Sequence, residues 1–277
     1  TERLNPLEKF KLDQFIMRGG KVLWMVETLQ VSMDSLSRRG VGMSRQYNLN
    51  LKDQLFKYGV RINTNLVQDL QSHAIPTIRS GRTGQRRRNF LPWPYYPLVT
   101  PQQDHPIVTN MSRIWLRFAN SIDTVASEGV DKTILLRSSP NARTLFHPVR
   151  INMQNIRKTM SERLYQAGPQ NLAVLLEGSF PSAFENRVAP ETLESSKYGE
   201  LKARSDTTKM IVVSDGDLIR NQINQMEGET IELGKDRYTR TNFANKTFAL
   251  NCVDYLLDES GLMSLRAKDY ELRMLNQ

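Results

Sequence analysis

Residues 209–226, KMIVVSDGDLIRNQINQM, are the stretch that decides the predicted fold class. The apolar run 210–213 is typical of a strand that is buried on both faces of a sheet. Ser214–Asp217 supply the turn that follows. Four apolar residues after the turn share one side of a helix: Leu218, Ile219, Ile223 and Met226. Because a strand, a turn and an amphipathic helix form half of a βαβ unit, we expect an α/β fold with a largely parallel central sheet flanked by helices.

Length and composition indicate a globular chain that can bury a sizeable core. The 277 residues are 39% hydrophobic and 24% charged, and no window approaches the roughly 18 apolar residues of a membrane span. We find no internal repeat and expect a single α/β domain over residues 1–277, with mobile insertions at about 72–92 and 182–206. The first residues, TERLNPLEKF, contain no initiator Met and no signal-peptide pattern, so we expect an excised soluble piece of a longer protein.

Arginines are concentrated in one segment of this basic chain, whose formal net charge is +9. The five are Arg79, Arg82, Arg86, Arg87 and Arg88. They could contact an anionic surface such as lipid headgroups, or they could belong to a flexible, solvated loop. We favour the loop. Membrane contact ranks ahead of nucleic acid, because no aromatic stacking residues lie among the arginines.

The first part of the chain is predicted to alternate helices and strands. Asn5 and Glu8 form a capping-box pattern around Pro6, which predicts a helix that ends at Gly19-Gly20. The Gly-Gly-Lys at this point closes a helix instead of opening one, so it is not a phosphate loop. The other elements expected here are a strand at 21–27, a surface loop at 32–46, a helix at 50–58 and a strand at 60–70.

The segment Leu91–Pro97 contains three prolines among Trp and Tyr residues. Because proline disrupts helices and central strands, the segment should run extended along an edge or across a face, with its rings packed. It could recognise a peptide, but we favour a rigid crossing strap. The later elements expected are strands at 114–125, 132–138 and 172–176, a helix at 155–166, a mobile excursion at 183–198, a helix capped by Asn242 and a last helix at 262–276.

Two strand ends carry polar residues that could form a ligand site. Glu177 and Ser179 follow the strand at 172–176, and Asp215 and Asp217 follow the strand at 210–213. Ligands collect where the carboxyl ends of parallel strands meet. The two aspartates could hold a hard cation such as Mg²⁺. The simpler interpretation, which we favour, is that one of them caps the helix that follows.

The sequence indicates no nucleophilic or metal centre. Gly178-Ser179 lacks the second glycine of a nucleophile elbow. Cys252 belongs to an apolar helical stripe and should be an inert core thiol; as the only cysteine it excludes an internal disulfide and a cysteine metal site. His73, His105 and His147 lack metal-ligand spacing. We therefore predict no catalytic residue, no metal and no cofactor.

Six blocks of sequence, in this order, carry a family resemblance: DQFIMRGGKVLWMVE, LKDQLFKYGVRINTNLVQD, LPWPYYPLVTPQQDHPIVTN, LAVLLEGSFPSAFENR, KMIVVSDGDLIRNQ and NKTFALNCVDYLLDESGLMSLRAK. With these blocks the chain resembles, from end to end, the GldG family of gliding-motility-associated ABC transporter auxiliary proteins. The resemblance implies a glutamine-amidotransferase-like, flavodoxin-like α/β core without a catalytic nucleophile. It also implies an ABC permease and a separate ATP-binding subunit as partners, and a location on the periplasmic side of the cell inner membrane.

The chain departs from the pattern of that family in two ways. The membrane helices are absent, and so is the segment that would precede Thr1 and supply the start of the core. We therefore expect a truncated fragment of a membrane-anchored protein, whose sheet could have an exposed edge. The arginine segment is not part of the family pattern.

The leading hypothesis is a non-enzymatic, extracytoplasmic, substrate-binding-like auxiliary component of an ABC transport complex for gliding motility or export. One alternative is a metal-assisted hydrolase or amidotransferase-like enzyme that uses Glu177, Asp215 and Asp217. Another is a polyanion-binding module that uses Arg79–Arg88, with no nucleic acid expected as its partner.

Overall fold

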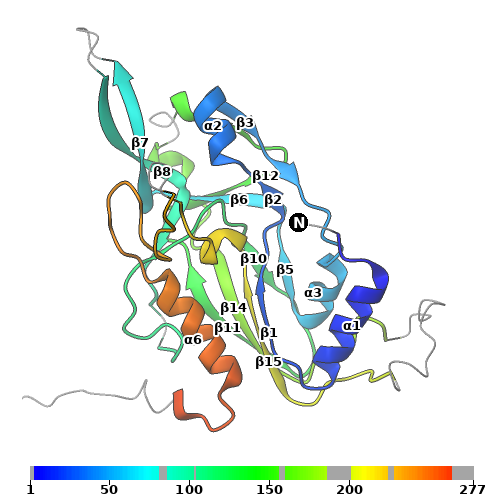
Figure 1. Cartoon of the computed structure of the whole chain (residues 1–277). Helices are drawn as coiled ribbons and strands as arrows, with labels where there is room; N and C mark the ends of the chain where they lie inside the picture. Colours follow the sequence, from blue (N-terminus) through cyan, green and yellow to red (C-terminus); the bar gives the residue numbers. More distant parts are fainter. Residues whose placement is uncertain are drawn as a thin grey trace, which may run out of the picture.

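The computed structural model describes residues 3–80, 86–102, 104–155, 160–185, 201–223 and 228–263. Its centre is a four-stranded sheet in the order β1-β15-β14-β11 (Figure 1). The strands are β1 (Val22–Met25), β15 (Thr208–Val213), β14 (Asn171–Gly178) and β11 (Val130–Arg137). β1 runs parallel to β15, whereas β14 runs antiparallel to both β15 and β11.

The prediction of a largely parallel, flavodoxin-like core is wrong. Among the described strands only the β1–β15 pair is parallel. The helix expected after β15 is a single 3₁₀ turn, η3 (Gly216–Ile219), so no helical crossover begins there. Ile219 and Ile223 are exposed, and Met226 lies outside the described residues. The apolar run 210–213 fits a buried strand of either direction, and the parallel interpretation depended on a helix that does not form.

The two middle strands of the sheet are buried on both faces. Along β15, Met210 and Val212 pack with α1 (Pro6–Met17) and α3 (Lys52–Tyr58), whereas Ile211 and Val213 pack with α6 (Asn245–Leu257). Figure 1 shows α6 on one side of the sheet and α1 and α3 on the other. The prediction that 172–176 and 210–213 form fully buried strands is confirmed.

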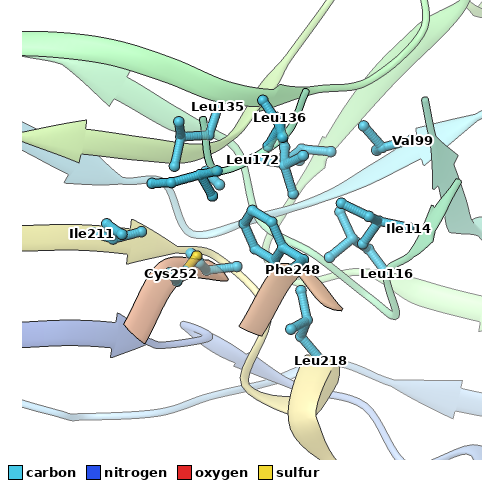
Figure 2. Close-up of a cluster of buried hydrophobic side chains, with 14 of the residues drawn as sticks. Val99, Ile114, Leu116, Leu135, Leu136, Leu172, Ile211, Leu218, Phe248 and Cys252 are labelled. Atoms are coloured by element: carbon cyan, nitrogen blue, oxygen red, sulfur yellow. The ribbon is translucent and has the colours of Figure 1, made fainter. Parts of the chain in front are cut away.

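The helix α6 fills the core on its side of the sheet. Phe248 and Cys252 point into a cluster that includes Leu172 of β14 and Ile211 of β15 (Figure 2). The predicted apolar stripe is therefore confirmed, and burial raises the pKa of the Cys252 thiol to about 12, as suits a core side chain. Asn242 does not cap the helix, because the cap position is Ala244, which makes no side-chain hydrogen bond.

The N-terminal helix α1 begins as predicted. Asn5 Oδ1 accepts a hydrogen bond from the Glu8 N–H, and the Glu8 carboxylate accepts one from the Asn5 N–H, both at 2.8 Å. The helix also buries Asp13, which accepts from the Tyr58 hydroxyl at 2.8 Å and from the Ser182 hydroxyl at 2.7 Å. Because Tyr58 ends α3 and Ser182 follows β14, this carboxylate joins α1 to two distant parts of the chain.

The segment 32–46 is not the surface loop that its polar composition predicted. Ser32 caps α2 (Met33–Arg39) by accepting from the Ser35 N–H at 3.2 Å, and Gly40 ends it at φ 72°. β3 (Val41–Met43) then pairs with β13 (Arg150–Asn152), and β4 (Arg45–Gln46) pairs with β2 (Leu29–Gln30). Strands this short have too few residues to show an alternating pattern.

Two of the predicted strands are each divided into two. The range 60–70 holds β5 (Val60–Ile62) and β6 (Asn65–Asp69), and the range 114–125 holds β9 (Ile114–Trp115) and β10 (Ile122–Thr124). β5 pairs with β10, and β6 pairs with β12 (Ala142–Phe146). The helix predicted at 155–166 is not seen in the described part, which has only the 3₁₀ turns η1 (Met153–Asn155) and η2 (Glu162–Leu164); residues 156–159 lie outside it.

The proline-rich segment belongs to a long hairpin. β7 (Ser72–Ser80) pairs with β8 (Arg86–Val99), and the hairpin extends away from the central sheet (Figure 1). Trp93, Tyr95 and Tyr96 are buried, and Tyr96 packs against Trp115 and Phe118. The expectation of an extended segment with packed rings is confirmed, and rings buried in this way are not available to recognise a peptide.

The arginine segment lies at the far end of the same hairpin. The backbones of Arg79 and Arg86–Arg88 belong to β7 and β8, with Arg79 opposite Arg87, so the expected insertion at 72–92 is strand over most of its length. Arg82 lies outside the described residues, as do 186–200, most of the excursion predicted at 183–198, and 264–277, most of the last predicted helix.

We predict that Phe248→Ala lowers the free energy of unfolding by about 3–5 kcal/mol, because it removes a fully buried ring from the core beneath α6. Cys252→Ala should cost about 1 kcal/mol, since it removes only a small buried side chain. The control is Leu250→Ala in the same helix, where the side chain is 54% exposed and the change should stay within about 0.5 kcal/mol. Denaturant titration measures all three. Equal losses for Phe248→Ala and Leu250→Ala would contradict the orientation of α6.

Candidate functional site

The carboxyl ends of β1 and β15 lie side by side because the two strands are parallel. Met25 is in register with Val213, and the chain continues from these residues to Glu27 and to the turn at 214–217. A Cβ added to Gly216 would lie 3.6 Å from the Met25 carbonyl oxygen and 3.7 Å from Glu27 Cγ. The two strand ends are therefore in direct contact, which brings three carboxyl groups to one place.

Asp215 is fully buried and acts as the cap of η3. Its Oδ1 accepts from the Asp217 N–H at 2.8 Å, and its Oδ2 accepts from the Arg117 N–H at 2.7 Å. Burial raises the pKa of this carboxyl to about 7, although the two N–H donors act to lower it. Asp215 is therefore the aspartate with a capping role, but the element that it caps is a single 3₁₀ turn and not the predicted helix.

Asp217 has a different environment from Asp215. Its Oδ1 lies 3.2 Å from a guanidinium nitrogen of Arg220, and its carboxylate is partly exposed. Within the residues that the structure describes, no group of three or more His, Cys, Asp or Glu side chains is arranged to hold a metal ion. The two aspartates are thus held differently, Asp215 by backbone N–H groups and Asp217 by a partly exposed ion pair.

Glu27 is the member of this cluster that the sequence did not single out. Burial raises the pKa of its carboxyl to about 8, and repulsion from Asp217 and Asp215 adds to the effect, while Arg220 opposes it. The signal was present, since Glu27 is the last residue of the strand predicted at 21–27. It could not be used without knowing that this strand lies next to the one before Asp215.

Two cavities open beside these strand ends. The smaller, of about 490 Å³, runs along β1 and reaches Glu27 and Asp217. The larger, of about 880 Å³, lies between α3, β5 and the segment that joins β4 to α3. Four residues with amide side chains line it, Gln46, Asn48, Asn50 and Asn63. The two cavities share Val26, Leu49 and Leu51, so they form neighbouring parts of one hollow surface.

Glu177 lies at the opposite end of the sheet from this cluster, contrary to prediction. β14 runs antiparallel to β15, which places Glu177 opposite Lys209 at the start of β15. Glu177 Oε1 accepts from the Tyr255 hydroxyl at 3.0 Å and lies 3.8 Å from Lys209 Nζ. The Lys209 ammonium also lies 4.3 Å from the centre of the Tyr255 ring. Glu177 therefore helps to fasten α6 to the sheet.

Ser179 makes a separate set of hydrogen bonds. Its hydroxyl donates to the Ser205 carbonyl at 2.7 Å and accepts from Arg204 Nε at 3.2 Å. The three histidines also lie apart. His73 is buried 3.5 Å from Asp236, His105 packs against Tyr255, and His147 Nδ1 lies 3.0 Å from the Ser44 hydroxyl. Ser179 has no histidine among its described partners, and the Ser44 hydroxyl beside His147 also accepts from the Val149 N–H at 2.9 Å.

We predict that Asp215→Ala lowers the free energy of unfolding by about 0.5–2 kcal/mol, because it leaves the Asp217 and Arg117 N–H groups without their acceptor. Asp217→Ala should change it by less than about 0.5 kcal/mol, since its ion pair is partly exposed. Thermal unfolding of the two variants at the same pH makes the comparison. A larger loss for Asp217→Ala than for Asp215→Ala would show that the capping role is assigned to the wrong residue.

We predict that Glu27→Gln makes the protein more stable than the parent at high pH. In the folded protein the Glu27 pKa is raised from 4.5 to about 8, so its favourable contribution is complete below pH 4.5 and is lost as the pH rises through 8. Glutamine removes that loss. The difference at pH 9 should be on the order of 1–2 kcal/mol and should vanish near pH 4. The control is Glu128→Gln, on an exposed turn. The prediction would be contradicted if both variants showed the same dependence of the free energy of unfolding on pH as the parent.

None of the described helices is long and apolar enough to cross a membrane.

The chain was compared with protein families, curated proteins and solved structures. No curated protein and no solved structure matches the chain. A family profile described as "ABC-type uncharacterized transport system" matches residues 1–252, which is most of the chain. The protein therefore belongs to this family of auxiliary proteins of ABC-type transport systems.

Proposed function

We propose that this chain is a non-catalytic, extracytoplasmic domain of an ABC transport complex that serves gliding motility or export. The observation that carries the proposal is the family match over residues 1–252, which indicates an association with an ABC transporter. The finer assignment, to a complex with a membrane permease and a separate ATP-binding subunit, follows the resemblance to gliding-motility proteins. That resemblance also implies the periplasmic side of the inner membrane as the location.

The absence of catalysis is part of this proposal, and the contacts of the candidate residues support it. Asp215 uses both carboxylate oxygens to accept backbone N–H groups. Ser179 donates to a backbone carbonyl, and Glu177 accepts from a tyrosine. A nucleophile or a general base needs a hydrogen-bonding position open to a substrate. These side chains serve the fold, whereas the cavities beside β1 offer room for a partner or a ligand.

We predict that the affinity-tagged, full-length protein, extracted in mild detergent from its native membranes, brings down a permease and an ATP-binding subunit. ATPase activity should follow the ATP-binding subunit through further separation and should be absent from this chain alone. A tagged periplasmic protein of another family is the control. Recovery of the tagged protein without either transporter subunit would contradict the proposed partnership.

The location has its own test. Protease added to spheroplasts should digest this domain without detergent, and a cytoplasmic marker protein should survive the same treatment. Protection of the domain until the membrane is opened would place it in the cytoplasm and overturn the extracytoplasmic assignment.

A further inference from the structure

The β7–β8 hairpin carries positive charge that its own sequence does not balance. Residues 70–103 contain no aspartate and no glutamate, and their five arginines, all within 79–88, supply five of the nine net positive charges of the chain. The next carboxylates along the chain are Asp69, which is buried and accepts hydrogen bonds from Ser139, and Asp104, which lies beyond β8. The hairpin is therefore the main source of positive charge in this basic protein.

The outer part of the hairpin is a two-stranded ribbon that stands clear of the core. Residues 78–80 of β7 pair with residues 86–88 of β8, and we call these two segments the arginine ribbon. β8 pairs with β9 only through Leu98 and Val99, so among the described strands the residues of the ribbon pair only with each other. Figure 1 shows the ribbon extending away from the central sheet. The backbones of four arginines thus lie outside the packed body of the protein.

The register distributes these four arginines over both faces of the ribbon. Residues directly opposite each other in an antiparallel pair share a face, and successive residues of a strand alternate between faces. Arg79 and Arg87 are opposite each other and therefore occupy one face. Arg86 and Arg88 flank Arg87 along β8 and occupy the other face. The ribbon therefore has two arginine positions on each face.

The base of the hairpin fixes the position of the ribbon. Trp93 is 1% exposed, Tyr96 packs against Trp115, and Ile75 of β7 is buried in the same cluster. A two-stranded hairpin is only marginally stable by itself, so this packing is what holds the ribbon in place. An extended chain from Ile75 to Ser80 spans about 17 Å at roughly 3.3 Å per residue. The arginines are therefore carried beyond the buried base.

The aromatic residues of the hairpin favour a lipid surface over a nucleic acid as the partner. Trp93, Tyr95 and Tyr96 are buried, so their rings are not available to stack on bases. Phe90, close to the ribbon along β8, is 43% exposed. One exposed ring does not make the row of stacking positions that binds single-stranded nucleic acid. Basic residues beside an exposed apolar side chain are instead typical of segments that lie at a membrane interface.

We propose that the arginine ribbon binds the phosphate groups of anionic phospholipids and rests on a bilayer surface, with Phe90 at the interface. The guanidinium group suits this role because it can donate two parallel hydrogen bonds to one phosphate. No acidic residue of the hairpin opposes the attraction, since residues 70–103 contain none. The inference rests on the charge and the placement of the hairpin and is independent of the transport function proposed above.

The test is co-flotation of the purified protein with phosphatidylcholine vesicles in which about a third of the lipid is phosphatidylglycerol. The protein should float with these vesicles and not with vesicles of phosphatidylcholine alone. Because the attraction acts between charges at a surface, raising the salt concentration from about 0.05 M to about 0.5 M should weaken the apparent affinity at least about tenfold.

Matched variants separate the ribbon from the overall charge of the protein. Replacing Arg79, Arg86, Arg87 and Arg88 by glutamine should weaken binding on the order of a hundredfold, since each basic residue near an anionic surface contributes about fivefold. Lysine at the same positions keeps the charge and should retain binding within about threefold. The control replaces exposed basic residues of α1 and α3 by glutamine and should weaken binding less than about fivefold; these residues are Lys11, Arg18, Lys52 and Lys57. Thermal unfolding at the parent midpoint shows that each variant is folded.

A fluorescent label shows which part of the protein meets the bilayer while all the arginines are kept. Asn89 is exposed beside the ribbon, so Asn89→Cys can carry a fluorophore that responds to polarity. The native Cys252 is fully buried and should not react. Emission from the label at 89 should shift to the blue with the phosphatidylglycerol vesicles. The same label at Leu250→Cys, on the exposed face of α6, should not shift.

Four results would overturn the proposal. Failure of the parent protein to float with the phosphatidylglycerol vesicles would show that the ribbon does not bind lipid. Equal losses for the glutamine variant of the ribbon and for the control on α1 and α3 would assign binding to the overall charge. Release by millimolar inorganic phosphate at constant ionic strength would indicate a site for an isolated phosphate. Tighter binding to DNA than to vesicles at equal phosphate concentration, lost in the glutamine variant of the ribbon, would make a nucleic acid the ligand.

Discussion

The hydrogen bonding of β15 to a parallel strand on one side and an antiparallel strand on the other determines where the polar residues of this protein lie. The parallel partner, β1, brings Glu27 to the same end of the sheet as Asp215 and Asp217. The antiparallel partner, β14, sends Glu177 to the opposite end. In an all-parallel sheet Glu177 would have joined the aspartates, but the antiparallel direction of β14 separates it from them. The parallel pair β1–β15 instead brings Glu27 to Asp215 and Asp217.

Burial of β14 and β15 on both faces imposes the layers around them. Every apolar side chain of these strands needs cover, which α6 supplies on one face and α1 and α3 supply on the other. The α1 layer is held by a buried carboxylate as well as by apolar contacts. Asp13 is acceptable in the interior because hydroxyls from α3 and from the segment after β14 donate to it. A buried charge without such donors would destabilise the fold by several kcal/mol.

The sequence predicted those features that local chemistry determines. The capping box of α1, the buried strands at 172–176 and 210–213, and the stripe of α6 all follow from residue types at short spacing. Strand direction was not predictable in this way, because an apolar run looks the same in a parallel and an antiparallel pair. The helix expected after β15 failed for a related reason. Leu218 is buried against the core beneath α6, but Ile219 and Ile223 of the same predicted stripe are left exposed.

The carboxyl cluster shows how neighbouring acidic residues can lie in different environments. Each carboxylate oxygen of Asp215 accepts a backbone N–H group, so this side chain serves the fold. Glu27 is half-buried beside the smaller cavity, where burial is the main cause of its raised pKa and repulsion from Asp217 and Asp215 adds to it. Glu27 therefore keeps its proton to a higher pH than an exposed glutamate does. Asp215 is buried more deeply, but its two N–H donors favour the charged form, so the backbone around each carboxyl decides how far burial can raise its pKa.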